Sequence, residues 1–308
     1  MILTITANPA VDRAYSVAEL VIGEVHRPTA MNATAGGKGL NVARVASILG
    51  AEVAAMGFIG GSNGAFIASE LKKLGFRDSF TRISGETRIC INIADAQGRS
   101  TELLESGPVI QPLEKRQFLQ DFSANLEQSS IITASGSLPK GLDGSFYCQL
   151  VQLAREKGKP MIVDTSGAAL QAVLGAKPFM VKPNRSELSR YLGREIAAEQ
   201  DLQSALQELH SQGIEIPLVT LGGDGAMACI DGSFYRFTAP RVQVKSAVGS
   251  GDSTIAGIAV GLEQGLPVVD AIRLGMAAGA ANTQFLQTGF ISRELVEEYY
   301  PAVKAVKC

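Results

Sequence analysis

The stretch Val248-Gly249-Ser250-Gly251-Asp252-Ser253-Thr254-Ile255-Ala256-Gly257 is the one around which we expect the chain to be organised. Small residues lead into an aspartate and an apolar run at helical spacing, which predicts a helix whose first turn leaves backbone N–H groups free. These groups and the helix dipole favour negative charge. An aspartate in that turn can take a proton from a hydroxyl, so the stretch favours phosphoryl transfer with Asp252 as base. An ordinary helix N-cap is the alternative.

Composition limits what the protein can be. The chain has 308 residues, of which 46% are hydrophobic and 19% charged, with a formal net charge of −2. We therefore expect one large domain with a small appendage, and neither a nucleic-acid-binding nor a membrane-binding surface. The first residues show no signal-peptide pattern and no apolar run is long enough to span a bilayer, so we expect a cytoplasmic protein. The four cysteines are far apart and are expected to be thiols.

Most of the chain alternates between strand and helix patterns, which predicts an α/β fold with a mostly parallel central sheet flanked by helices. The predicted strands cover residues 2–7, 52–58, 130–135, 161–164, 179–181 and 216–221. The predicted helices cover residues 63–74, 112–127, 145–157, 199–211, 252–264 and 267–286. A further hairpin is expected at residues 227–237, where Asp231-Gly232 supplies the turn.

Two hairpins interrupt this alternation. The first lies within residues 13–32 and has its strands at 14–17 and 25–29, and the second pairs 87–93 with 99–104 through a turn near Gln97-Gly98. Together they predict a small four-stranded β-sheet lid over the edge of the main sheet. Such a lid would exclude water from the site.

A second glycine-rich helix entrance lies between the hairpins, at Ala35-Gly36-Gly37-Lys38-Gly39. It lacks the Walker A pattern, because neither the first glycine nor the Ser or Thr of that pattern is present at the required spacing, and no dinucleotide fingerprint is present. A glycine turn with an incidental lysine is the alternative. Loops after parallel strands gather at one sheet edge, so we expect 135–139, 181–187 and 220–226 to lie near Asp252.

These motifs, taken in order, resemble the ribokinase-like (PfkB-type) carbohydrate kinases: Ala35–Gly39, then Lys182-Pro183-Asn184 with Glu187, then Val248–Asp252. Further stretches resemble the phosphosugar branch, which contains 1-phosphofructokinase and tagatose-6-phosphate kinase; they are residues 6–12, 85–88, 135–139 and 164–170. Residues 166–173 and Ser250 favour the tagatose-6-phosphate kinases. Ala7 departs from the leucine that is common there, which affects packing only. The resemblance implies one ribokinase-like kinase domain over residues 1–308, with lid strands inserted at about 13–32 and 87–104.

The resemblance also implies residue roles. Asp252 would be the catalytic base, with the N–H groups of Gly249, Ser250 and Gly251 as an anion hole. The substrate residues would be Asp12, Gly36, Gly37 and Asn41 for the sugar, Arg27 and Arg88 for its phosphate, and Lys38 and Ser137 in support. The nucleotide residues would be Lys182, Asn184, Thr220, Gly222, Gly225 and Asn282. Asn184 and Glu187 would organise Mg²⁺ through water, although a helix capping box explains the pair equally well.

The activity implied is ATP- and Mg²⁺-dependent phosphorylation of the free primary hydroxyl of a ketohexose monophosphate, with tagatose 6-phosphate favoured over fructose 1-phosphate. A kinase of an unphosphorylated sugar, or a sugar-phosphate-binding regulator without turnover, is the alternative, and a nicotinamide oxidoreductase fits poorly. A monovalent cation such as K⁺ stays open. A four-stranded sheet cannot bury both faces alone, so we expect a homodimer through the lid.

Overall fold

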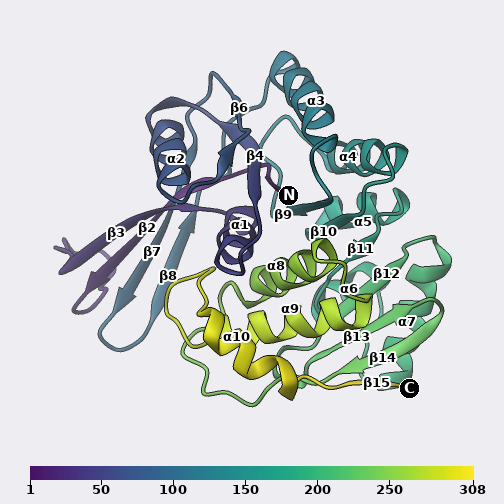
Figure 1. The fold of residues 1–308 in the computed structure, drawn as a ribbon. Helices are drawn as coiled ribbons and strands as arrows, with labels where there is room; N and C mark the ends of the chain where they lie inside the picture. Colours follow the sequence, from purple (N-terminus) through teal and green to yellow (C-terminus); the bar gives the residue numbers. More distant parts are fainter.

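The computed structural model describes residues 1–308 and shows a large sheet between two layers of helices, with a separate small sheet projecting from one side (Figure 1). The chain passes from the main sheet into the small one at Asn8-Pro9, directly after its first strand. The predicted α/β architecture, which is that of the ribokinase-like fold, is confirmed.

The main sheet has eleven strands in the order β15-β14-β13-β12-β11-β10-β9-β1-β4-β5, with β6 also paired to β4. Strands from β5 to β12 pair in parallel, and β13, β14 and β15 extend the sheet antiparallel. Their bounds are β1 Ile2–Thr6, β4 Val53–Ile59, β5 Arg77–Asp78, β6 Thr81–Arg82, β9 Ile131–Ser135, β10 Met161–Asp164, β11 Met180–Val181, β12 Ile216–Thr220, β13 Ala226–Ile230, β14 Ser233–Phe237 and β15 Ala305–Lys307.

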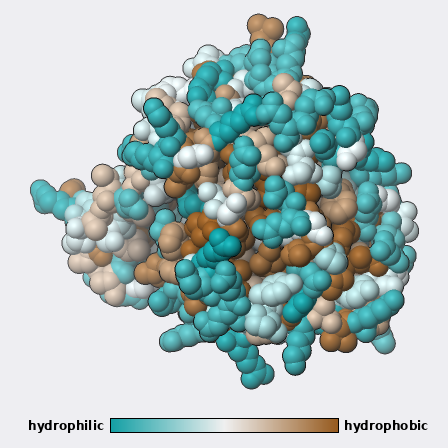
Figure 2. Space-filling model, in the orientation of Figure 1, coloured by the Kyte–Doolittle hydropathy of each residue, from teal (hydrophilic) through white to brown (hydrophobic).

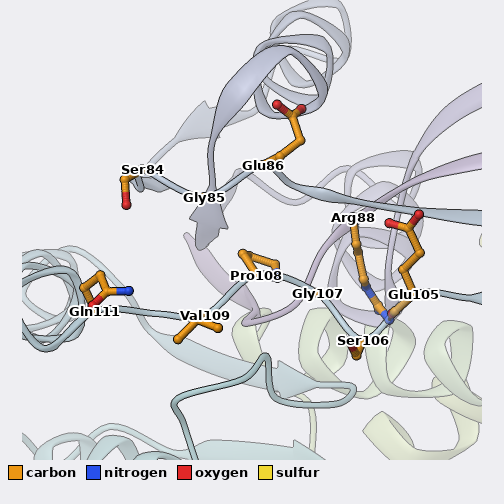
Figure 3. Close-up of a pocket in the computed structure, with 10 residues that line it drawn as sticks. All are labelled: Ser84, Gly85, Glu86, Arg88, Glu105, Ser106, Gly107, Pro108, Val109 and Gln111. Carbon is orange, nitrogen blue, oxygen red and sulfur yellow. Dashed lines mark hydrogen bonds between the residues drawn. The ribbon is translucent and has the colours of Figure 1, made fainter.

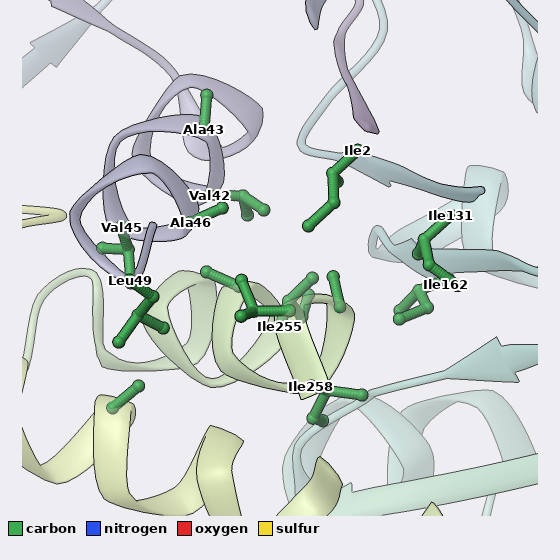
Figure 4. Close-up of a cluster of buried hydrophobic side chains, with 14 of the residues drawn as sticks. Ile2, Val42, Ala43, Val45, Ala46, Leu49, Ile131, Ile162, Ile255 and Ile258 are labelled. Carbon is green, nitrogen blue, oxygen red and sulfur yellow. The ribbon is translucent and has the colours of Figure 1, made fainter. Parts of the chain in front are cut away.

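The central strands are apolar on both faces and therefore support two cores. On β1, Ile2 contributes to one core and its neighbour Leu3 to the other, as the two-residue period of a strand requires. The first core packs under α1 Lys38–Ile48, α2 Gly61–Lys73, α8 Ser250–Glu263, α9 Val268–Asn282 and α10 Arg293–Tyr299 (Figure 4). The second packs under α3 Pro112–Leu126, α4 Gly144–Glu156, α5 Gly167–Gly175, α6 Arg185–Leu192 and α7 Glu199–Ser211.

Helix α8 is the most enclosed helix of the first layer, since every residue from Asp252 to Gly261 is buried. It packs closely along α9, where a Cβ added to Gly257 would lie 2.7 Å from the Cα of Gly275. Only glycine permits this approach of the two backbones. The packing fixes the direction in which the N-terminus of α8 points.

The small sheet, which we call the lid, has the strand order β3-β2-β7-β8, with bounds β2 Ala10–Val17, β3 Ala30–Gly36, β7 Arg88–Asp95 and β8 Ser100–Leu104. The predicted second hairpin agrees closely with β7 and β8. The first does not, because residues 25–29 lie in an exposed loop and the partner of β2 is 30–36. Pro28 has no N–H for a ladder, which disfavours the predicted strand.

Several further predictions differ at their ends. Helix α9 stops at Asn282 instead of reaching residue 286, and the short elements α5, α10 and β15 were not predicted. The hairpin at 226–237 is confirmed, with Asp231 and Gly232 at φ 49° and 70°. All four cysteines are free, and no helix combines the length and apolar character needed to cross a bilayer.

Candidate active site

The carboxyl ends of the central strands and the N-termini of α1 and α8 enclose a cleft of about 730 Å³. It brings together sequence motifs that lie far apart along the chain, as the parallel topology predicts. The predicted site residues that line it are Lys38, Lys182, Asn184, Glu187, Thr220, Gly222, Gly225, Gly249, Ser250, Gly251 and Asp252.

Asp252 lies in the first turn of α8 and is only 6% exposed. Its Oδ2 accepts a hydrogen bond of 2.9 Å from Asn41 Nδ2 on α1. Burial, and next the nearby Asp164 carboxylate, raise the pKa of Asp252 to about 6, against the effects of Asn41 and two lysines. A carboxylate with this pKa is ionised at neutral pH yet accepts a proton more readily than an ordinary aspartate.

Asp164, at the end of β10, is the acidic centre of the cleft and was not among the predicted site residues. It is 3% exposed and lies 3.5 Å from both Lys38 Nζ and Lys182 Nζ. The charge of Asp164 is the main cause that raises the pKa of Lys38. Two ammonium groups are thus held at the cleft, where they favour phosphate charge. Its position after a buried strand, next to the Thr165-Ser166-Gly167 turn, is the sequence feature that could have identified it.

The N-terminus of α8 has no side-chain cap. The N–H groups of Gly249 and Gly251 make no hydrogen bond within the chain, whereas that of Ser250 donates to the Ala247 carbonyl at 3.2 Å. Gly249 has φ 83°, a left-handed conformation that glycine adopts at little cost. Two of the three predicted anion-hole donors are therefore free to bind an anion.

Asn184 and Glu187 form a reciprocal capping box at the start of α6. Asn184 N donates to Glu187 Oε2 at 2.9 Å, and Glu187 N donates to Asn184 Oδ1 at 2.8 Å. The box leaves Glu187 Oε1 without a partner, at the wall of the cleft. No group of three or more His, Cys, Asp and Glu side chains is gathered for a metal. Mg²⁺ commonly keeps several waters and takes phosphate oxygens, so these donors fit the water-mediated role.

Asp12 on lid strand β2 and the glycines at the end of lid strand β3 form the second part of the candidate site. Burial raises the pKa of Asp12 to about 6, against the charges of Arg88 and Arg44. Gly36 lies directly against it, and any side chain at 36 would collide with the Asp12 carboxylate. Gly37 has φ 117° and is the N-cap of α1. This part joins the first through Asn41, which bonds Asp252.

Arg88, at the start of β7, lines a separate polar cleft of about 610 Å³ between the lid and the main sheet. Figure 3 shows its side chain beside Glu105, on the two segments that frame this cleft. Its guanidinium donates to the Asn8 carbonyl from Nε and Nη2, at 3.2 and 2.8 Å, and to the Glu105 carbonyl at 2.8 Å. Three of five N–H groups are therefore used and two remain. Ser137 is exposed and accepts from Asn8 Nδ2 at 3.4 Å.

Two predicted site residues lie elsewhere. Arg27 is exposed in the loop between β2 and β3, not on a lid strand. Asn282 is fully buried at the end of α9 and does not line the cleft. Its Nδ2 donates to the Val248 carbonyl at 2.8 Å, and its Oδ1 accepts from Ser253 Oγ and Gly289 N, both at 3.1 Å. Asn282 thus holds the loop that leads into α8.

Arg44 on α1 is a charged residue at the site that sequence reasoning missed. Its guanidinium bonds the Asn41 side chain and the carbonyls of Ala35 and Thr288. Arg44 follows Asn41 by three positions, which places both on one helix face. That spacing was the available indication.

The fold agrees with comparison to known proteins. The family model for pfkB family carbohydrate kinases matches residues 5–294. This chain therefore belongs to the PfkB family of carbohydrate kinases, which are phosphotransferases with an alcohol acceptor.

Among similar solved structures are two of phosphofructokinase-2 from Escherichia coli, each with 29% identity over 98% of both chains. One is a complex with potassium, with a TM-score of 0.91, and the other a complex with fructose-6-phosphate, with a TM-score of 0.89. A Thermotoga maritima protein described as a possible 1-phosphofructokinase shares the fold, with 24% identity, a TM-score of 0.89, and 100% of this chain and 99% of that chain covered. These neighbours agree with the phosphosugar branch.

Proposed function

We propose that this protein transfers the γ-phosphate of ATP, with Mg²⁺, to the free primary hydroxyl of a ketohexose monophosphate, and that tagatose 6-phosphate is its preferred substrate. The observation that carries the proposal is the buried Asp252 carboxylate beside the free N–H groups of α8, at the junction of the nucleotide cleft and the Asp12 region.

The arrangement supports a direct transfer. The substrate hydroxyl attacks the γ-phosphorus in line and gives its proton to Asp252, while ADP leaves. The Gly249 and Gly251 N–H groups, with Lys38 and Lys182, would stabilise the charge that develops on the transferred group, and their position at the cleft supports this role. Mg²⁺ bound to the phosphates, with Glu187 holding a water, would neutralise part of the charge on ATP. Lys182, Thr220, Gly222 and Gly225 would border the nucleotide.

The phosphate already on the substrate is assigned to Arg88, with Ser137 in support. A guanidinium with two unused N–H groups can grip a phosphate at two oxygens. Asp12, Gly36, Gly37 and Asn41 lie between Arg88 and Asp252 in this scheme, where the sugar hydroxyls would bind. The proposed preference for tagatose 6-phosphate rests on the resemblance of residues 166–173 and Ser250 to the tagatose-6-phosphate kinases. Arg27 would have to move with its exposed loop to reach the phosphate.

ADP release measured with tagatose 6-phosphate, fructose 1-phosphate, fructose 6-phosphate, ribose and no sugar tests the proposal. We expect stimulation by the ketohexose monophosphates, greatest with tagatose 6-phosphate, and none by ribose. Greatest activity with fructose 1-phosphate would make the protein a 1-phosphofructokinase. Activity with ribose alone would point to an unphosphorylated substrate. Absence of stimulation throughout would leave a binding regulator.

A monovalent cation near the α8 N-terminus is part of the proposal, supported by the potassium complex of the Escherichia coli phosphofructokinase-2. ADP release in KCl, compared with tetramethylammonium chloride at equal ionic strength, tests it. We expect a lower rate without K⁺. Equal rates would remove the cation from the scheme.

We also propose that residues 1–308 act as one kinase domain and that two copies pair through their lids. The lid face that carries Val11 and Ile89 packs against α2 near the main body. Further out, the same face presents Ile91, Met31 and Leu103, of which the last two are 65% and 57% exposed. Figure 2 shows the lid as a lobe projecting from the body, with apolar residues among polar ones. A second copy would cover this apolar face.

A further inference from the structure

Arg44 joins three segments that border the active site. From α1, its Nη1 donates to Asn41 Oδ1 at 3.1 Å and to the Thr288 carbonyl at 3.2 Å, and its Nη2 donates to the Ala35 carbonyl at 2.9 Å. Ala35 belongs to lid strand β3, and Thr288 lies in the loop after α9. A planar guanidinium can serve these three acceptors at once in a fixed geometry, which the ammonium of a lysine cannot.

The bond to Asn41 determines which way that amide faces. Asn41 Oδ1 accepts from Arg44, and Asn41 Nδ2 donates to Asp252 Oδ2 at 2.9 Å. Turning the amide over would put its NH₂ against the guanidinium and its oxygen against the carboxylate, so both contacts would become repulsive. With Arg44 in place only one orientation is favourable. The catalytic base thus receives a hydrogen bond whose donor is held by Arg44.

The other contacts of Arg44 return to the same helix N-terminus. Gly289, next to Thr288, donates its N–H to Asn282 Oδ1 at 3.1 Å, and Asn282 Nδ2 donates to the Val248 carbonyl just before α8. The loop at 288–289 is therefore fixed from one side by Arg44 and from the other by Asn282. Hydrogen bonds therefore connect lid strand β3, through α1, to the base Asp252 and to the loop before the α8 N-terminus.

We propose that Arg44 is a positioning residue for the phosphoryl transfer, which holds the Asn41 amide toward Asp252 and links lid strand β3 to the α8 N-terminus. The inference rests on the proposed function only in that Asp252 is the base. It concerns a residue that would touch neither sugar nor nucleotide, and it predicts an effect on the chemical step more than on binding.

The charged groups around Asp252 and Arg44 determine in which direction the pH dependence of kcat should shift. Asp252 is surrounded by Asp164, Lys38 and Lys182, and Arg44 by Asp12 and Glu70. Loss of the guanidinium would let the Asn41 oxygen turn toward Asp252 and would remove a positive charge. Loss of the hydrogen bond from Asn41, which lowers the pKa of Asp252, would raise that pKa. Since the ionised form is the base, the rise of kcat with pH would move to higher pH.

The test compares Arg44→Met with the parent and with Arg273→Met as a matched control. Arg273, on α9, also donates to a carbonyl distant in sequence, that of Val303, and pairs with Asp270. Neither of these contacts belongs to the hydrogen bonds that connect Arg44 with Asp252. For Arg44→Met we expect kcat to fall by about 10- to 100-fold with little change in KM, together with the upward shift of the acid limb. Arg273→Met should lower thermal stability only. Parental kcat and pH profile in a folded Arg44→Met would overturn the proposal.

Two further measurements keep the test decisive. If Arg44→Met does not fold, Arg44→Lys replaces it, with the same direction expected and a parental profile again overturning the proposal. In the Asn41→Ala background, Arg44→Met should lower kcat much less than in the parent; full additivity would contradict action through Asn41.

If the parent shows no sugar-dependent ADP release, the proposed function fails by itself. NMR titration of the ¹³C-labelled Asp252 carboxyl then decides, because a pKa higher in Arg44→Met supports the proposal and an equal one overturns it.

Discussion

At the scale of single residues, the candidate site contains two carboxylates, the buried Asp252 and the partly buried Asp12, whose pKa values burial raises to about 6. Keeping such groups ionised at neutral pH opposes folding, because the unfolded chain would solvate them fully. Active sites commonly contain groups that lower folding stability in this way, because the reaction needs their shifted pKa values. The sequence analysis named both residues as candidates, Asp252 from its place after a glycine-rich helix start and Asp12 from the family resemblance.

The Asp252→Asn variant should therefore be more stable than the parent at pH 8. The folded-state pKa of Asp252 lies above its unfolded value of 3.8, so the parent loses stability as pH rises from about 4 to about 6. The amide oxygen of the variant can still accept the bond from Asn41, and the amide does not titrate in that window. We expect a gain of up to about 3 kcal/mol at pH 8 that vanishes near pH 4. Urea unfolding at both pH values measures it, and an equal difference at both would contradict the burial argument.

The pH dependence of kcat in the parent should reflect the same carboxylate. Only ionised Asp252 can accept the hydroxyl proton, so kcat should rise with pH through about 6 and then level off. Initial rates of ADP release between pH 5 and 8 give the profile. A rate that is constant over this range would mean that a group with another pKa accepts the proton.

Arg88→Ala should weaken binding of phosphorylated sugars specifically. The loss of two charge-assisted hydrogen bonds is expected to raise KM by an amount equivalent to about 1 to 3 kcal/mol. Arg82→Ala is the matched control, since Arg82 pairs with Asp78 at the surface. KM values for tagatose 6-phosphate decide the matter, and unchanged values in Arg88→Ala would favour an unphosphorylated substrate.

The residues that the sequence analysis missed or misassigned are those whose side chains bond other side chains or carbonyls at the candidate site. Arg44 and Asp164 were missed, and Asn282 was assigned to the nucleotide although its side chain is fully buried and forms three hydrogen bonds inside the protein. These roles depend on contacts between residues far apart in the chain, such as Arg44 with Thr288. A single sequence carries no record of such contacts.

At the scale of elements, two helix N-termini and one loop define the centre of the site. Motif-bearing helices were predicted well, because glycines and apolar spacing mark their starts. The first lid hairpin was misplaced, since the apolar residues of its loop, such as Val25, have strand-like composition. Val25 is 88% exposed, so its apolar character did not indicate a strand. Which segment pairs with β2 depends on tertiary contacts and not on local composition.

The loop at 288–289 gives an element-scale prediction. Gly289 has φ 62°, and a Cβ there would lie 2.6 Å from the Asn41 Cβ. Gly289→Ala should therefore displace Asn41 and lower kcat as well as stability. Gly265→Ala is the control, because Gly265 has φ 78° and no neighbour within 4 Å. Both variants should lose about 1 to 2 kcal/mol of unfolding free energy, and only Gly289→Ala should lose activity. Equal kcat values in the two would contradict the positional role.

At the scale of the whole molecule, the α/β class and the parallel sheet followed from the alternation of strand and helix patterns. The antiparallel hairpin of β13 and β14 was also predicted, but the addition of β15 was not, because β15 is a three-residue strand whose pairing with β14 depends on the completed fold. The lid extends from this body and leaves one apolar face uncovered. Its interpretation as a dimer interface stays a prediction.

Leu103→Glu should dissociate the proposed dimer, because it puts a charge on the uncovered face of the lid. Ser100→Glu adds the same charge to the same strand on the opposite face, as the strand alternation requires. Sedimentation velocity at micromolar concentration should show a dimer for the parent and Ser100→Glu and a monomer for Leu103→Glu. A monomeric parent would exclude the lid-to-lid pairing at that concentration.

The central claim is that Asp252 takes the proton from a sugar-phosphate hydroxyl while the α8 N–H groups hold the transferred phosphoryl group. ADP release by Asp252→Asn at saturating tagatose 6-phosphate and ATP tests it most directly. We expect a fall in kcat of about 10²- to 10⁴-fold in a protein that remains folded. Turnover at the parental rate would show that the proton leaves by another route and would contradict the account.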